Sequence, residues 1–211
     1  MKSGSNGSGP ASEFGVEYFE YQHRPRSFLR RLARRIFLRK ALSLTRGATL
    51  DFGCGTGELL ALLPTGSLGI DINEHAVRHC RSLGLDAITL SELGGGTGFK
   101  GLGVRRFRTI ILSHVLEHLP DAAETLRSVM EDSARLGAER IVVIVPGHAG
   151  FLQDETHRTF IDAAYLRAHG FLPVTPSGWR QVLASYFPVD SRRIAHAIPW
   201  VELQVVFERA E

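Results

Sequence analysis

The chain has 211 residues, of which 44% are hydrophobic and 22% are charged, and these proportions are those of an ordinary folded protein. A chain of this size buries roughly 70% of its unfolded surface, so folding requires neither a metal nor a disulfide. The net charge of +3 is uneven, since residues 1–50 carry ten Lys or Arg against three Glu while residues 51–211 are net acidic, which excludes a uniformly basic domain that coats nucleic acid.

The cysteines and the hydrophobic runs indicate the cellular compartment of the protein. Cys54 and Cys80 form no C-x-x-C pair and no zinc-ligand spacing, which excludes a disulfide scaffold and a zinc ribbon. The longest aliphatic run, residues 141–145, is far shorter than the ~20 residues of a membrane span. No apolar stretch of the kind found in an export signal follows Met1. We therefore expect a cytoplasmic protein.

The first 45 residues divide into two segments. Residues 1–15 are rich in Gly and Ser, which is typical of a flexible linker or of a tail added for expression. Residues 16–45 are predicted to contain a basic amphipathic helix, whose apolar face is expected to hold Phe28, Leu29, Leu32, Ala33, Ile36, Phe37 and Ala41.

The basic face of this helix allows two interpretations. Eight Lys or Arg lie between Arg24 and Lys40, so the helix is either peripheral to an anionic membrane surface or packed over the site with a solvated face. The basic face is expected to hold no aromatic residue of the kind that stacks on bases, which argues against nucleic acid as a partner.

From residue 46 to residue 211, strand and helix patterns alternate. Strands are predicted at 48–52, 68–72, 87–90, 109–113 and 140–145, and helices at 58–63, 74–83, 122–136 and 162–169. Two further stretches, 189–196 and 201–208, predict a closing antiparallel hairpin. We therefore expect one α/β domain at residues 46–211, with a doubly wound, mostly parallel sheet and a C-terminal antiparallel hairpin.

Three glycines at alternate positions follow the first strand. In Asp51-Phe52-Gly53-Cys54-Gly55-Thr56-Gly57, glycine lets the backbone take positive φ and lets a ligand approach without meeting a Cβ. The second strand ends at Asp71, the position from which a carboxylate grips ribose hydroxyls in doubly wound nucleotide-binding folds, although an acid there can also serve a helix N-terminus. The glycine spacing differs from the dinucleotide fingerprint G-x-G-x-x-G.

This pairing resembles the class I S-adenosylmethionine-dependent methyltransferases, whose first motif is D/E-x-G-x-G-x-G and whose second is an acid ending the second strand. The resemblance spans about residues 46–207 and includes Val115-Leu116-Glu117-His118-Leu119, which is similar to the E-H-L stretch of the small-molecule and sugar methyltransferases. It implies S-adenosyl-L-methionine as cofactor, with Asp71 on the ribose and Ile72 beside the adenine. The cofactor-binding residues that it implies are Asp51, Gly53, Cys54, Gly55, Gly57, Asp71, Ile72, Glu92 and Ser113.

A second group of chemistry-bearing residues is His114-x-x-Glu117-His118. As a bare motif it is the inverted zinc-peptidase signature, which needs both His on a helix and a third ligand such as Glu131 or Glu139. It also resembles the E-x-x-E-H segment of the ubiquinone-pathway O-methyltransferases and the small-RNA 2′-O-methyltransferases, which holds a divalent ion together with a later His. This chain has His114 where those families have Glu.

That resemblance implies a divalent metal held by His114, Glu117, His118 and His157. Without a metal, His118, His157 and Glu117 are the catalytic candidates, as base or substrate anchor. In a purely structural role, Glu117 and His118 only fix the loop.

We expect a methyltransferase that acts on a hydroxyl of a small metabolite, sugar or lipid-linked saccharide. The alternatives are an RNA ribose 2′-O-methyltransferase with a divalent metal, a zinc metallopeptidase, and a non-catalytic adaptor that binds the cofactor.

Overall fold

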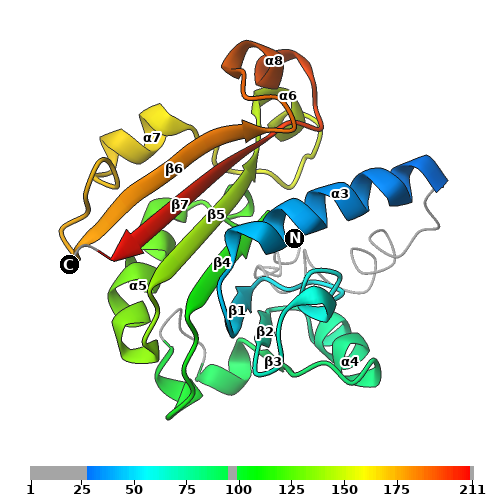
Figure 1. Ribbon diagram of the computed structural model, residues 1–211, viewed down its shortest axis with the longest axis vertical. Helices are drawn as coiled ribbons and strands as arrows, with labels where there is room; N and C mark the ends of the chain where they lie inside the picture. Colours follow the sequence, from blue (N-terminus) through cyan, green and yellow to red (C-terminus); the bar gives the residue numbers. More distant parts are fainter. Residues whose placement is uncertain (1–27, 95–98, 210–211) are drawn as a thin grey trace, which may run out of the picture.

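A computed structural model describes residues 28–94 and 99–209 of the chain (Figure 1). The predicted tail, residues 1–15, lies outside the described residues, as does the start of the basic segment. Within the described part, seven strands form one sheet in the order β3-β2-β1-β4-β5-β7-β6. The strands are β1 (Thr49–Phe52), β2 (Leu68–Asp71), β3 (Ala87–Thr89), β4 (Thr109–Ser113), β5 (Arg140–Pro146), β6 (Trp179–Phe187) and β7 (Glu202–Arg209). The first five are parallel, and β7 pairs antiparallel with both β5 and β6.

The helices predicted at 74–83, 122–136 and 162–169 are present between the strands, but residues 58–63 form only a single turn of 3-10 helix at Leu60–Leu62. The described helices are α3 (Phe28–Leu44), α4 (Glu74–Ser82), α5 (Ala122–Ser133), α6 (His148–Phe151), α7 (Ala163–Ala168) and α8 (Arg192–Ala197). The intervening single turns of 3-10 helix are η1 (Leu60–Leu62), η2 (Ser91–Leu93), η3 (Phe99–Leu102), η4 (Leu116–His118) and η5 (Ala134–Leu136). Among the described residues, no helix combines the length and the apolar character that crossing a bilayer requires.

Alternate residues of the central strands enter separate cores on the two faces of the sheet. On β4, Ile110 and Leu112 pack in the core that contains α5, whereas Ile111 packs with α3 through Leu38. Successive side chains of a strand point to opposite faces, so the continuous apolar runs of β4 and β5 are explained by cover on both sides. The α/β fold predicted from the sequence is confirmed.

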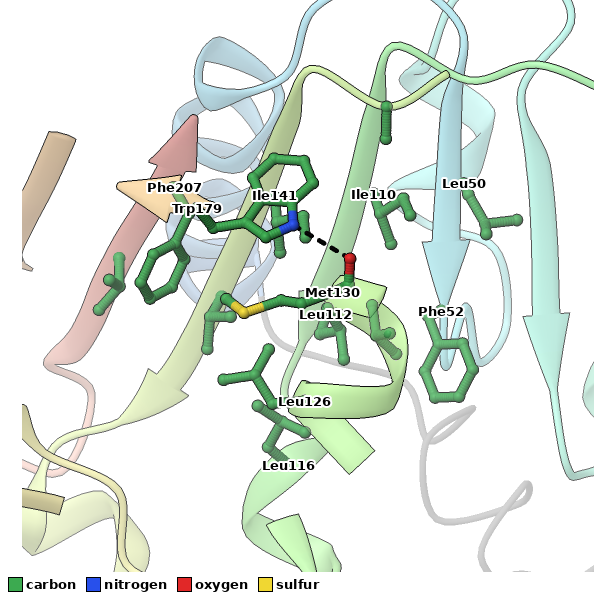
Figure 2. Close-up of a cluster of buried hydrophobic side chains, with 14 of the residues drawn as sticks. Leu50, Phe52, Ile110, Leu112, Leu116, Leu126, Met130, Ile141, Trp179 and Phe207 are labelled. Carbon is green, nitrogen blue, oxygen red and sulfur yellow. Dashed lines mark hydrogen bonds between the residues drawn. The ribbon is translucent and has the colours of Figure 1, made fainter. Parts of the chain in front are cut away.

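The larger core is closed by a tryptophan at the start of β6 (Figure 2). The indole Nε1 of Trp179 donates a 3.0 Å hydrogen bond to the carbonyl of Met130 on α5, and the ring is buried beside Phe207 of β7. A buried indole N–H without a partner would be costly, so this bond lets a large ring occupy the core.

The C-terminal antiparallel pair is present, but its first strand is not the one predicted. Residues 192–197 form the helix α8, because the hydroxyl of Ser191 caps its N-terminus by accepting from the amide of Ile194 at 3.4 Å. The partner of β7 is β6, an edge strand in which exposed and half-buried residues alternate.

The helix α3 forms as predicted, but its buried face is rotated from the one expected. Leu32 and Ile36 are 48% and 51% exposed, whereas Leu38, Ala41 and Leu44 are buried against the sheet. The sequence offers two overlapping apolar stripes, and contact with the sheet selects the one that runs through Leu38.

Candidate functional site

Strand register brings the predicted site segments to one edge of the sheet. Phe52 of β1 lies opposite Ile70 of β2 and Leu112 of β4, so the residues that follow these strands emerge together. This carboxyl edge is where ligands bind in open α/β sheets. The glycine turn, Asp71 and the His114–His118 segment are therefore neighbours.

The glycine turn has the backbone that its sequence predicts. Gly53, Gly55 and Gly57 have φ of 79°, 52° and 79°, values that favour glycine. At two of these positions, packing beneath the turn is a second reason why glycine is required. A Cβ on Gly53 would lie 2.3 Å from Cγ2 of Val115, and one on Gly57 would lie 2.8 Å from Sγ of Cys80.

Asp71 joins the turn to the end of β2. Its Oδ2 accepts a 2.7 Å hydrogen bond from the amide of Gly55, and its Oδ1 accepts a 2.8 Å bond from the amide of Asn73. Asn73, rather than Asp71, caps α4, since its side chain accepts from the amides of the first helical turn. Ile72 beside it is 41% exposed, which leaves an apolar surface at the place expected for the adenine.

Asp51 lies beneath the turn as a buried carboxyl. Burial and the charge of Asp71 raise its pKa to about 7, while the charge of Arg34 opposes that shift. Arg34 belongs to α3 and also pairs with Glu58 at 2.8 Å, so α3 crosses close to the turn. A groove of about 450 Å³ lies along this crossing, and it is lined by Arg31, Leu32, Arg34, Arg35, Leu38, Glu58 and Leu62.

Cys54 and Cys80 meet under the turn, a contact that sequence reasoning missed. Both are buried, and their Sγ atoms lie 3.9 Å and 3.4 Å from the carbonyl oxygen of Gly55. A hydrogen bond with Cys80, together with burial, raises the pKa of Cys54 well above its ordinary value. The Cys54 side chain thus packs into the core, and only its backbone remains for the predicted cofactor contact.

Glu92 and Ser113 occupy different parts of the edge. Glu92 is exposed, and its carboxylate accepts from the Thr89 amide at 2.6 Å and pairs with Arg81 at 2.9 Å. The bonds from Thr89 and Arg81 lower the pKa of Glu92 to about 2. Ser113 ends β4 and is half-buried. Contact of these two residues with the cofactor stays a prediction.

His114 stands between two buried carboxylates. Its Nδ1 lies 3.1 Å from Oε1 of Glu117, and its Nε2 lies 3.2 Å from Oε2 of Glu202. Burial alone would lower the pKa of His114, but the hydrogen bonds with Glu117 and Glu202 outweigh it and raise the pKa to about 10. Glu202, 88 residues away on β7, was missed because no local pattern in the sequence marks it.

Glu117, His118 and His157 form a group that could hold a metal ion. One ligand atom from each lies within 4.8 Å of the others. The structure leaves His114 out of this group, since carboxylates face both of its ring nitrogens. Glu117 is buried, and its Oε2 has no hydrogen-bond partner among the described residues. A buried carboxylate oxygen in this state is suited to a cation.

The two imidazoles of this group are oriented by polar neighbours. Thr156 donates to Asp154 at 2.6 Å, so its hydroxyl oxygen accepts from Nδ1 of His118 at 3.0 Å. Nδ1 of His157 donates to the carbonyl of Phe151 at 2.8 Å. Both arrangements place the proton on Nδ1 and the lone pair on Nε2, as in metal-ligating histidines. Burial also lowers the pKa of His118, which favours the neutral ring.

The zinc-peptidase interpretation is wrong. It needs a helix that carries both histidines, but His114 has a φ of 57° and only Leu116–His118 form a single 3-10 turn. Its proposed third ligands also lie elsewhere, since Glu139 pairs with Arg108 at 2.7 Å and neither Glu139 nor Glu131 joins the group.

Comparisons with known proteins agree with the fold described above. Residues 20–143 match a family model described as a methyltransferase domain. A search of curated proteins found no match.

Solved structures extend the likeness over nearly the whole chain. The magnesium protoporphyrin IX methyltransferase of Synechocystis PCC 6803 with bound SAH has a TM-score of 0.64 at 16% identity, over 95% of this chain and 98% of that one. A SAM-dependent methyltransferase of Archaeoglobus fulgidus has a TM-score of 0.61 at 19% identity, over 91% of this chain and 99% of that one. The methyltransferase domain of bacterial CtHen1-C has a TM-score of 0.58 at 14% identity, over 83% and 96%.

The glycine turn, the acid that ends β2 and the sheet order are those of the class I fold, and the family match covers more than half of the chain. The protein therefore belongs to the methyltransferase-domain family and is a class I S-adenosylmethionine-dependent methyltransferase.

Proposed function

We propose that the protein methylates a hydroxyl oxygen of a small metabolite or a saccharide, with a divalent cation at Glu117, His118 and His157. The observation that carries the proposal is the position of these three residues beside the glycine turn. Val115, at the start of their segment, fills the space that a Cβ on Gly53 would take. Val115 thus connects the glycine turn to the segment that carries Glu117 and His118.

The residues fit a divalent cation. Two imidazole nitrogens and a carboxylate oxygen suit zinc and other divalent first-row metals, and the buried Oε2 of Glu117 has no hydrogen-bond partner in the described structure. Bound there, the ion would lower the pKa of an acceptor hydroxyl. The stacked ring of Phe151, 5.4 Å from that of His157, further holds this ligand in place.

The protein's own residues support hydroxyl chemistry as well. Methyl transfer from a sulfonium needs in-line placement of the acceptor and, for a hydroxyl, removal of a proton. Without an ion at this site, Nε2 of His118 is suited to accept that proton, because burial lowers its pKa and favours the neutral ring. His157 faces it, with ring centroids 4.8 Å apart.

A ribose hydroxyl of RNA is the second candidate acceptor. It is favoured by the recurrence of the Glu117-His118 pair with a later His157, as in the segment of the small-RNA ribose methyltransferases. Against it stands the exposed face of α3, where Arg31 and Arg35 lie beside Leu32 and Ile36 and residues 31–36 include no aromatic residue. The same face supports the predicted contact with an anionic membrane surface.

A labelling experiment tests the proposal. The protein is incubated with methyl-labelled cofactor and cell extract, which is then separated into saccharide, lipid, RNA and small-molecule fractions. We expect label in a small-molecule or saccharide fraction, its loss in His118→Ala, and retention in His169→Ala, which changes an exposed histidine at the end of α7. Label confined to RNA would select the second candidate. Cofactor binding without transfer to any fraction would indicate an adaptor.

A further inference from the structure

His114 has an unusual backbone for its residue type. Among residues 28–94 and 99–209, it is the one non-glycine residue with a positive φ, 57°. Such a conformation is strained and persists only where surrounding contacts hold it. Here the amide of His114 donates a 2.9 Å hydrogen bond to the carbonyl of Ile144, and carboxylates lie on either side of the ring.

The ring of His114 connects two elements that are far apart in the sequence. Glu117 belongs to the turn η4 after β4, and Glu202 begins β7, where it lies opposite Pro146 of β5. Carboxylate oxygens accept hydrogen bonds, so Nδ1 donates to Glu117 at 3.1 Å and Nε2 donates to Glu202 at 3.2 Å.

Glu202 is itself held in place. It is 5% exposed, and its second oxygen, Oε1, accepts a 2.7 Å hydrogen bond from Nε2 of Gln204, which is fully buried. Both oxygens of Glu202 are therefore engaged, one by Gln204 and one by His114. A carboxylate fixed at both oxygens is a rigid anchor for the ring between it and Glu117.

The chain of contacts ends at the candidate cation site. His114 bonds to Oε1 of Glu117, and the oxygen that remains is the buried Oε2, which has no partner in the part of the chain that the structure describes. Glu117 is also the carboxylate of the group formed with His118 and His157. The bond from His114 thus selects which oxygen of Glu117 is left for an ion and fixes the plane of the carboxylate.

We infer that Glu202 is a positioning residue for the Glu117 carboxylate and acts on it through His114. The inference rests on the proposed cation site and adds to it a residue on β7 that contacts none of the three ligands in the described bonds. His114 stands at the position where the resembling families have Glu. Under this inference it holds the Glu117 carboxylate in place and does not coordinate the ion.

Binding of Co²⁺ tests the inference without a methyl acceptor. Co²⁺ is titrated into the intact protein, and its visible absorption gives both the dissociation constant and a spectrum that depends on ligand geometry. We expect Glu202→Ala to weaken binding by about tenfold or more and to alter the spectrum. Glu202→Gln keeps one acceptor oxygen, so it should lose less affinity than Glu202→Ala.

Glu208→Gln is the matched control. Glu208 lies on the same strand and pairs with Arg46 at 2.9 Å and with Arg140, so its substitution also removes a β7 carboxylate from an ion pair. It should leave the Co²⁺ affinity and spectrum unchanged. If Glu202→Ala does not fold, as judged by circular dichroism, Glu202→Gln decides the question.

The outcomes separate two failures. Wild-type affinity and spectrum in the folded Glu202 variants would overturn the positioning role and leave the cation site standing. Absence of Co²⁺ binding in the wild type would overturn both. Binding of S-adenosylhomocysteine, measured by calorimetry in the same samples, reports on the cofactor site independently and should be equal in wild type and variants.

Discussion

The backbone amide of Gly55 donates a 2.7 Å hydrogen bond to Oδ2 of Asp71, and this bond joins the turn after β1 to the end of β2. The two segments that are predicted to face the cofactor are thus fixed relative to each other before any ligand binds. The second oxygen of Asp71 holds the amide of Asn73 and so anchors the start of α4.

Substitution of Asp71 should therefore abolish cofactor binding. Asp71→Ala removes a carboxylate that holds two amides, and hydrogen bonds to charged groups contribute about 1.5–3 kcal/mol each. We expect a loss of about 100-fold or more in affinity for S-adenosylhomocysteine, measured by titration calorimetry. Glu74→Gln, at the exposed start of α4, is the control and should bind like the wild type. An affinity for Asp71→Ala within threefold of wild type would contradict the assignment.

The buried carboxyl of Asp51 predicts that stability falls with rising pH. Its pKa is about 7 in the fold against an ordinary value of 3.8, so between these values the folded state binds more protons than the unfolded state. The free energy of unfolding should thus decrease from about pH 4 to about pH 7, by at most ~4 kcal/mol from this group. Urea unfolding at pH 5 and pH 8 should show a smaller decrease in Asp51→Asn. An equal decrease in both proteins would exclude this cause.

A pair of glycine substitutions separates backbone strain from steric overlap. Gly53 and Gly84 have φ of 79° and 75°, but a Cβ on Gly53 would overlap Val115 at 2.3 Å, whereas one on Gly84 would meet nothing within 4 Å. Gly84→Ala should cost ~1 kcal/mol and Gly53→Ala at least ~2 kcal/mol more in denaturant unfolding. Val115→Ala should recover part of the difference. Equal costs at the two positions would show that overlap is unimportant.

Metal content should depend on both histidines of the candidate cation site. After dialysis against Mn²⁺ and then against buffer, elemental analysis should find the ion in wild type and His169→Ala. His118→Ala and His157→Ala should each lower the retained amount by about tenfold or more, because each removes one of three ligands. Unchanged content in His118→Ala would count against coordination by this residue.

The orientation of α3 can be tested by the same substitution at two positions. Leu38→Ala should cost ~2–3 kcal/mol of stability because Leu38 packs with Ile111 and Val142 on the sheet. Leu32→Ala should cost less than ~0.5 kcal/mol, since Leu32 is 48% exposed. Comparable costs would place α3 in the orientation that its apolar period suggested.

The parallel half of the sheet was predictable because its signals are local. β4 and β5 contain continuous apolar runs, the glycine turn follows β1 directly, and Asp71 is the last residue of β2. Strands buried on both faces read as near-continuous apolar runs, so short patterns suffice to find them. The position of the glycine turn followed from such local patterns.

The antiparallel edge was harder to predict, for a physical reason. β6 has one exposed face, so its apolar content is diluted, and residues 189–196 resemble a strand until Ser191 caps the helix. The network around His114 was missed for another reason. Glu202 reaches it only because β7 inserts beside β5, and no spacing in the sequence encodes that contact.

The position of β7 in the sheet has a consequence for synthesis. It is the last strand described, yet it lies inside the sheet between β5 and β6, and Val206 on it packs in the same cluster as Leu38 of α3. A ribosome releases α3 long before its packing partner on β7. Ile111 of β4 and Ile144 of β5 can cover part of the apolar face of α3 earlier, so the cluster is completed only when β7 inserts beside β5.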